Sequence, residues 1–308
     1  MKKRVFLVLF VGLATLALSV QFLSPVGPTM ISVVGMLEQR VPQEIPAQFT
    51  FWSSFDQVTA EIASGRAEIM ALPVTLGATL YNRGIDVRLL AVTLWEGFYL
   101  VAPEGTVQSA GDLEGMQLYT PQGKGQTGDV LIRVMLQQQG LDPEKDVSIL
   151  YATPPEIIGL MSAGKVKAAV LPEPFVSLAL QKVPGLAIAM DMQKVWETTS
   201  GTPRVPITGI FVRGDTLEQK PLETISTLLA LRDSIHFAMQ NTDDALQLTT
   251  KYFQGMPVGV LKQSMTRSGF AFTSMLVGAD EVKSYFQTVH ELTPEAMPTL
   301  PPDDFYVQ

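Results

Sequence analysis

The sequence contains no cysteine, which excludes a disulfide scaffold, a thiolate metal site, a cysteine nucleophile and a lipid-modified cysteine after a signal segment. Histidine is nearly as scarce, because the 308 residues include only His236 and His290, far apart in the chain. A zinc or iron site built on several histidines is therefore excluded. The sequence also lacks a Gly-x-Ser-x-Gly motif, which excludes a serine hydrolase of that type.

Basic residues are in deficit, with 22 lysines and arginines against 30 acidic residues and a formal net charge of −8. A nucleic-acid groove needs clustered lysine and arginine, so this balance disfavours a nucleic-acid partner. Hydrophobic residues make up 46% and charged residues 17%, which argues against a disordered chain. The length fits one large domain or two domains of ordinary size, with a full hydrophobic core.

The first twenty residues differ from the rest. Lys2, Lys3 and Arg4 form a positive start, and residues 5–20 then contain no charge. The small residues Ala17 and Ser19 are placed for a cut after Ser19, so residues 1–19 are predicted to be a signal peptide. The alternative is an uncleaved N-terminal anchor, although the run is short for a membrane span. Either way the folded part is expected to be periplasmic or otherwise extracytoplasmic.

The remaining chain alternates short apolar runs with stretches of helical period, which predicts an α/β fold with mostly parallel strands. After Gly214 the pattern changes to helices, expected at 217–239, 242–253, 259–268 and 279–290, and the tail after Pro294 is expected to be extended. The expected strands are 20–23, 48–52, 68–72, 88–94, 98–101, 116–120, 147–151, 167–171 and 206–212.

Two segments of the sequence resemble each other. In 64–73 and in 163–172, a glycine that ends a helix is followed by a basic residue, a short strand and a Leu-Pro pair. Proline lacks an N–H donor and ends each strand at its carboxyl edge, where open α/β sheets bind ligands. The repeat predicts one copy in each half of a two-lobed protein, although helix, glycine, strand and turn recur in any α/β fold.

Specific motifs resemble one family. The segment 112–123, DLEGMQLYTPQG, is similar to the entry to the second lobe in substrate-binding proteins of ABC importers. The branch it resembles is the sulfonate, nitrate, taurine and thiamine-precursor group. The segment 163–175, AGKVKAAVLPEPF, is similar to the same group, with Lys167 where an acidic residue is usual. The earlier copy keeps that acid as Glu68, and the resemblance covers most of residues 20–213.

The resemblance implies a two-lobe periplasmic binding fold, type II-like, with the ligand in the cleft between the lobes. Lobe 1 is expected at 20–101 plus 213–308 and lobe 2 at 102–212. The lobes would close over a small-molecule solute by hinge motion. A membrane permease and an ATPase on other chains would then import it. A monomer without a cofactor or a metal is expected, attached to the membrane only through the permease or an uncleaved anchor.

Loops at the strand ends supply the candidate ligand residues. The sharpest is the turn at 121–127, where two glycines expose backbone N–H groups just before a helix and Lys124 adds a full positive charge. This turn favours an anion, and the alternative is a solvated flexible turn. The ending that a nucleotide P-loop requires is absent. The candidates here are Gln122, Gly123, Lys124, Gly125, Gln126 and Thr127.

Aromatic and hydroxyl side chains give a second group. Trp52 and Trp95 each end a strand, where an indole can cover a flat ligand or simply pack under a loop. Thr29 and Thr75 can bond a ligand or cap the next helix. Glu173 stands at the family's common Glu position, where it can bind or anchor the interlobe region. The full group is Gly27, Pro28, Thr29, Trp52, Ser53, Pro73, Val74, Thr75, Trp95, Tyr151, Pro172, Glu173 and Thr208.

The predicted function is the extracytoplasmic solute-binding component of an ABC importer, not an enzyme. Lys124 and the glycine turn suggest a sulfonate, carboxylate or phosphate, and the tryptophans suggest an aromatic compound, so a heteroaromatic anion would satisfy both. One alternative is a two-lobe enzyme of thiamine-precursor or menaquinone biosynthesis, but such an enzyme would normally be cytoplasmic. The other is an extracytoplasmic sensor module that binds a solute without delivering it.

Overall fold

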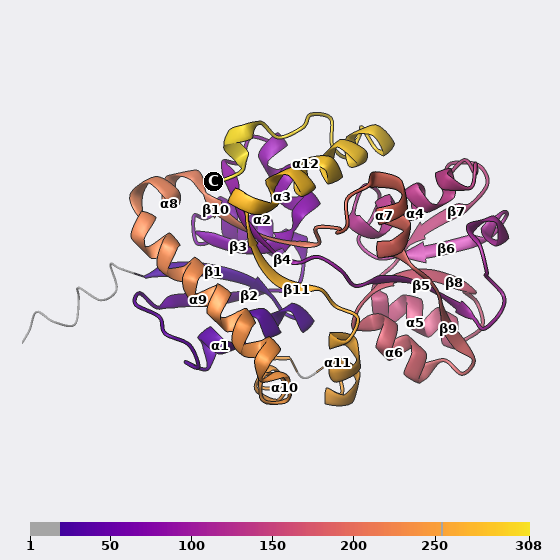
Figure 1. Ribbon diagram of the computed structural model, residues 1–308, viewed down its shortest axis with the longest axis horizontal. Coiled ribbons are helices and arrows are strands. Elements are labelled where there is room, and N and C mark those ends of the chain that lie inside the picture. Colours follow the sequence, from indigo (N-terminus) through magenta and orange to yellow (C-terminus); the bar gives the residue numbers. More distant parts are fainter. Residues whose placement is uncertain (1–18, 254) are drawn as a thin grey trace, which may run out of the picture.

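Two β-sheets, each covered by helices, make up a computed structural model that describes residues 19–253 and 255–308 (Figure 1). The first sheet has the strand order β11–β4–β10–β3–β1–β2, and the second has the order β7–β6–β8–β5–β9. We call the part around the first sheet lobe 1 and the part around the second sheet lobe 2. This arrangement confirms the predicted two-lobe α/β fold class.

The strands are short and mostly buried, as the apolar runs predict. Lobe 1 contains β1 (Val20–Pro25), β2 (Ala47–Trp52), β3 (Ile69–Pro73), β4 (Val87–Leu94), β10 (Thr208–Arg213) and β11 (Phe270–Ser274). Lobe 2 contains β5 (Phe98–Pro103), β6 (Gln117–Thr120), β7 (Ser148–Tyr151), β8 (Ala168–Pro172) and β9 (Leu186–Asp191).

Helices connect the strands and cover the sheets. Several begin at the signals seen in the sequence: Ser54 caps α2 through Gln57, and Thr153 forms a capping box with Glu156 at the start of α5. The helices are α1 (Val34–Leu37), α2 (Phe55–Ala63), α3 (Val74–Asn82), α4 (Thr127–Gln138), α5 (Pro154–Ser162), α6 (Phe175–Lys182), α7 (Met192–Ser200), α8 (Gly214–Gln219), α9 (Pro221–Gln240), α10 (Thr242–Thr249), α11 (Val258–Met265) and α12 (Met275–Leu292), with short 3₁₀ turns η1 (Pro28–Ser32), η2 (Ala110–Leu113) and η3 (Asp303–Phe305).

The repeated sequence segments occupy equivalent places in the two sheets. β3 and β8 each have five residues, end in proline and show the same burial pattern. β3 lies between the antiparallel β10 and the parallel β1, and β8 lies between the antiparallel β5 and the parallel β6. The two lobes therefore share one internal topology, and their ligand-side edges are built in the same way.

The chain crosses between the sheets at two adjacent segments. The predicted lobe boundaries, 101/102 and 212/213, fall inside β5 and β10, yet β5 belongs to the second sheet and β10 to the first. We therefore place the crossings earlier, at 95–97 and 201–207. There the N–H of Ile207 donates to the carbonyl of Leu94 at 2.8 Å, and the Arg204 guanidinium lies 4.0 Å from the Trp95 ring centroid.

Packed side chains also join the lobes. α12 packs on β4 and β11 of lobe 1 and reaches α4 and α7 of lobe 2, where the rings of Tyr285 and Trp196 lie 5.3 Å apart (Figure 1). Elsewhere α11 packs against α6, with Leu261 and Val176 in one apolar cluster. The lobes are thus connected by side-chain contacts as well as by the two crossing segments.

Three sequence expectations are wrong in detail. The strands are not mostly parallel, because β5 and β10 each cross to the other lobe and pair antiparallel there. The C-terminal part is not all helical, since β11 adds an edge strand beside β4. The expected helix 217–239 is two helices, because α9 begins at Pro221, a residue without a backbone N–H.

Residues 1–18 of the predicted signal segment lie outside the described residues. Ser19 is described, is buried, and is followed at once by β1. Among residues 19–253 and 255–308, no helix combines the length and the apolar content that a membrane crossing needs.

Candidate ligand-binding cleft

Four strands end at one cavity between the lobes. Pro25 of β1, Trp52 of β2, Pro73 of β3 and Pro172 of β8 are the last residues of their strands, and all four line a cavity of about 160 Å³. Thr208, the first residue of the antiparallel β10, completes this edge. The carboxyl edges of both sheets therefore face one shared space, which is where open α/β sheets bind ligands.

A wider cavity continues from this inner one toward solvent. It has a volume of about 630 Å³ and shares Pro25, Trp52, Gln122 and Pro172 with the inner cavity. We call the two together the interlobe cleft. Its combined volume suits a small molecule. The outer part is also lined by Val26, Ser53, Ser54, Pro121, Tyr151, Ala152, Thr153, Pro154, Glu156 and Phe175.

Helix N-termini lie around the interlobe cleft. The helices α2, α3, α4, α5 and α6 each begin at or next to a lining residue, and such ends carry a partial positive charge. Asp56, Asp129 and Glu156 in the first turns of α2, α4 and α5 offset part of this charge. Within the described residues that line the two cavities, lysine, arginine and histidine are absent. An anionic solute in this cleft would be held by backbone N–H groups and neutral side chains, because the lining offers no cationic side chain.

The two acids of the interlobe cleft already have partners. The N–H and hydroxyl of Thr153 donate to Glu156, and these hydrogen bonds hold the pKa of Glu156 below its usual value. Both oxygens of Glu173 are bonded, one to Arg267 at 2.5 Å and the other to the N–H and hydroxyl of Ser177. Neither carboxylate is free to serve as the main anchor for a cationic ligand.

Gln122, at the interlobe cleft, has an unusual backbone conformation. Its φ is 79°, a left-handed conformation that costs energy for a residue with a Cβ, and its side chain lines both cavities. In the structure that is described, its side-chain amide has no protein partner. Such strain tends to persist where the geometry has a use. Gln122 is thus the best-placed free hydrogen-bonding side chain between the two cavities.

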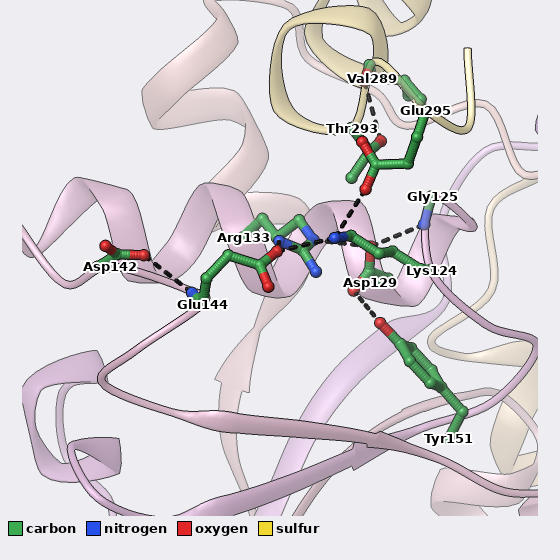
Figure 2. A network of polar contacts seen from close by, with 10 residues as sticks. All are labelled: Lys124, Gly125, Asp129, Arg133, Asp142, Glu144, Tyr151, Val289, Thr293 and Glu295. Carbon is green, nitrogen blue, oxygen red and sulfur yellow. Dashed lines mark hydrogen bonds and ion pairs between the residues drawn. The ribbon is translucent and has the colours of Figure 1, made fainter.

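A buried carboxylate, that of Asp129, fixes the position of Tyr151 in the lining of the outer cavity. Asp129 is fully buried on α4 and accepts from the N–H of Gly125, the guanidinium of Arg133 and the hydroxyl of Tyr151, each at 2.8 Å (Figure 2). Burial, and then the charge of Asp129, raises the pKa of Tyr151, so this phenol stays protonated and remains a donor. Tyr151 lines the outer cavity, and its hydroxyl is fixed by the hydrogen bond to Asp129.

The structure does not bring Lys124 to the interlobe cleft. Its ammonium pairs with Glu144 at 2.9 Å and with Glu295 at 2.7 Å (Figure 2). Glu295 belongs to the C-terminal segment after α12. Hydrogen bonds that the ammonium donates to Glu295 and Glu144 raise the pKa of Lys124. The expectation that Lys124 charges the ligand site stays a prediction of the sequence, and in the structure two nearby acids occupy the ammonium.

Replacing Lys124 by alanine is expected to leave solute affinity within about threefold of the parent chain. Its partly exposed ion pairs should contribute about 1 kcal/mol or less to stability. Calorimetric titration and urea unfolding measure both quantities, with Lys145→Ala, another exposed ion-pair lysine, as the control. An affinity loss of about tenfold or more in Lys124→Ala alone would return Lys124 to the binding site.

The structure explains why glycine stands at positions 123 and 125 of the same turn. The N–H of Gly125 is already bonded to Asp129, and a Cβ on Gly125 would lie 2.1 Å from the Cβ of Ala296. Gly125 therefore permits a close approach of the C-terminal segment. Gly123, with a φ of 134°, faces open space and does not line either cavity.

Ten of the predicted residues line the interlobe cleft and the others lie around it. Trp95 is buried in the first crossing segment, where it donates to Thr273 at 3.1 Å. Thr75 and Gln126 bond each other between the lobes at 2.7 Å. Gly27 and Val74 are outside the lining, and Pro28 begins η1. The lining set is Thr29, Trp52, Ser53, Pro73, Gln122, Thr127, Tyr151, Pro172, Glu173 and Thr208.

Sequence reasoning missed most of the apolar lining. Pro25 and Leu72 belong to strand-end segments that the sequence singled out, but neither was chosen as a ligand residue. Phe98 begins β5, and its place becomes evident only once β5 is known to run antiparallel to β8. The other missed residues of the inner cavity are Ala71, Leu94 and Ile207.

Comparisons with known proteins agree with this geometry. Residues 110–249 match the NMT1-like family. An ABC transporter structure from Parabacteroides distasonis is 24% identical, with 94% of this chain and 99% of that chain covered and a TM-score of 0.76. The periplasmic aliphatic sulphonate binding protein SsuA from Escherichia coli is 17% identical, with 94% and 92% covered and a TM-score of 0.76.

The nitrate-binding protein NrtA from Synechocystis is 14% identical, with 83% of this chain and 73% of that chain covered and a TM-score of 0.66. A search of curated proteins found no match. The family resemblance predicted from the motifs is confirmed by these matches, and the fold is that of periplasmic binding proteins of ABC importers.

Proposed function

We propose that this chain is the extracytoplasmic solute-binding component of an ABC importer. The observation that carries the proposal is the convergence of Pro25, Trp52, Pro73 and Pro172, the ends of strands from both lobes, on one cavity. An importer would supply a permease and an ATPase as partners on other chains. The chain would act as a monomer that binds its solute and does not transform it.

The solute class follows from the lining of the interlobe cleft. We propose a small molecule with an anionic or strongly hydrogen-bond-accepting head and a flat apolar body, such as a heteroaromatic anion. Gln122, the threonines of the inner cavity and the helix N-termini would hold the head. Trp52, Tyr151 and Phe175 would cover the body. Closure of the lobes by a hinge at the crossing segments would exclude water.

Two other functions remain distinguishable by experiment. A two-lobe enzyme would convert its solute without a partner chain, so turnover by the purified protein would favour it. A sensor module would bind the same solute but would not restore uptake in a strain that lacks the chain. Thermal shift measurements over a panel of sulfonates, nitrate, carboxylates and thiamine precursors identify the solute, because specific binding raises the melting temperature.

Replacing Gln122 by glycine tests the proposed site. The change removes a ligand donor and relieves the left-handed strain, so affinity and stability should move in opposite directions. We expect affinity for the best solute of the panel to fall about tenfold, the effect of one lost hydrogen bond to a charged group. The free energy of unfolding without solute should stay level or rise by about 1 kcal/mol.

The control for this test is Gln139→Ala, an exposed glutamine at the end of α4 and outside the interlobe cleft. Both measurements should be unchanged there. Undiminished affinity in Gln122→Gly would remove Gln122 from the site. No melting shift with any solute of the panel, together with no rescue of uptake, would overturn the proposed function itself.

A further inference from the structure

One helix of lobe 1 exposes a row of large apolar side chains. On α9, Leu222, Ile225 and Leu229 are 71%, 54% and 47% exposed, and their spacing places them on one helical face. Thr224, Thr227 and Leu231 on the opposite face are buried. We call the three exposed residues the α9 stripe. An exposed apolar row on one helical face can serve as a contact surface.

The start of the folded chain lies at the same corner of the molecule. Ser19 is buried, its carbonyl accepts from the ammonium of Lys220 at 3.1 Å, and its hydroxyl accepts from Gln48 at 3.1 Å. Lys220 is the residue immediately before α9, and Val20 already belongs to β1. Figure 1 shows the start of β1 beside the start of α9. In the sequence, the uncharged residues 5–18 directly precede this corner.

We propose that residues 5–18 are retained as a membrane anchor and that the α9 stripe rests on the outer surface of the same bilayer. A cut after Ser19 would remove these contacts and leave a charged amine on Val20, a buried residue. An uncleaved run without a spacer instead holds the Lys220 corner at the membrane. The stripe begins two residues beyond Lys220, at Leu222.

The chemistry of the segment and of the helix fits a bilayer. Lys2, Lys3 and Arg4 precede the uncharged run, which orients the folded part outside the cytoplasm. Fourteen residues, 5–18, are fewer than the roughly 20 that span a hydrocarbon core, so the adjoining corner is drawn against the interface. Apolar residues on one helical face are the part of a helix that enters such an interface. This inference rests on the extracytoplasmic placement proposed above.

Because the chain has no cysteine, single-cysteine variants report on each surface separately. Leu222→Cys, Ile225→Cys and Leu229→Cys test the stripe. Leu276→Cys and Val277→Cys, at the start of α12 and each 74% exposed, are the matched controls. Each variant of the full chain is labelled with a fluorophore and placed in vesicles of phosphatidylcholine and phosphatidylglycerol that carry a nitroxide quencher at headgroup depth.

We expect the three stripe positions to be quenched at least about twofold more than the two controls. Equal quenching at all positions overturns the proposal. The proposal is also overturned if the intact mass of the membrane-bound chain shows that its first residue is Ser19 or a later residue. A change in fluorescence at the stripe positions that depends on protein concentration and not on lipid would indicate that a second copy of the chain covers the stripe. This result would also overturn the proposal. The solute-induced melting shift should persist in Leu222→Cys, which separates this outcome from failure of the proposed function.

Discussion

Replacing Trp52 by alanine is expected to lower solute affinity by about 30-fold or more, corresponding to about 2 kcal/mol. Trp52 ends β2 and lines both parts of the interlobe cleft, so a flat solute in either cavity can contact its indole. Its ring nitrogen donates to the carbonyl of Ala71 at 3.3 Å, which fixes the indole at the edge of the sheet. Calorimetric titration with the best solute of the thermal shift panel measures the loss.

The same change also removes a buried ring from the core of lobe 1. Truncation of a buried tryptophan costs about 3–5 kcal/mol, so unfolding must be measured beside binding. Trp52→Phe keeps an aromatic face and should retain most of the affinity. Phe211→Leu, which alters a fully buried aromatic residue of lobe 1 outside the lining of the cleft, should change stability and leave affinity unchanged. Equal affinities for Trp52→Ala and the parent chain would show that the solute does not touch this wall.

Local signals in the sequence were sufficient where a residue's neighbours in the chain decide its place. The Leu-Pro ends at Pro73 and Pro172 depend only on the helix, glycine and strand before them, and both line the inner cavity. Ser54 and Thr153 cap the helices that directly follow them. These features place the carboxyl edges of both sheets, and so they place the interlobe cleft, without knowledge of the strand order.

Long-range contacts decided which predicted residues lie outside the lining of the interlobe cleft. The role of Lys124 depends on Glu295, which approaches it only after α12 has returned across the lobes. Trp95 has the same strand-end position as Trp52, but it lies in a crossing segment under Arg204. The strands β9 and β11 pair at sheet edges with strands that are distant in the chain. Spacing along the chain carries no information on such partners.

Replacing Arg267 by methionine is expected to destabilise the protein by about 3–5 kcal/mol, the cost of leaving a buried carboxylate without its cation. The side chain of Glu173 is 1% exposed, and Arg267 is its only cationic partner among the residues described. Arg267 also donates to the hydroxyl of Ser177 at 2.7 Å. Arg267 follows α11 of lobe 1 and Glu173 follows β8 of lobe 2, so the pair joins the lobes beside the inner cavity.

A double substitution separates the missing cation from the other effects of the change. Glu173→Met combined with Arg267→Met removes both charges, and the free energy of unfolding should recover most of the loss, because paired buried charges are often replaceable by apolar residues. Arg232→Met, which breaks an exposed pair with Asp233, should cost about 1 kcal/mol or less. Urea unfolding at neutral pH measures all three variants. If Arg267→Met were no more destabilising than Arg232→Met, the lobes would be held by the apolar contacts of α11 and α12, and the buried pair would be a consequence of their packing.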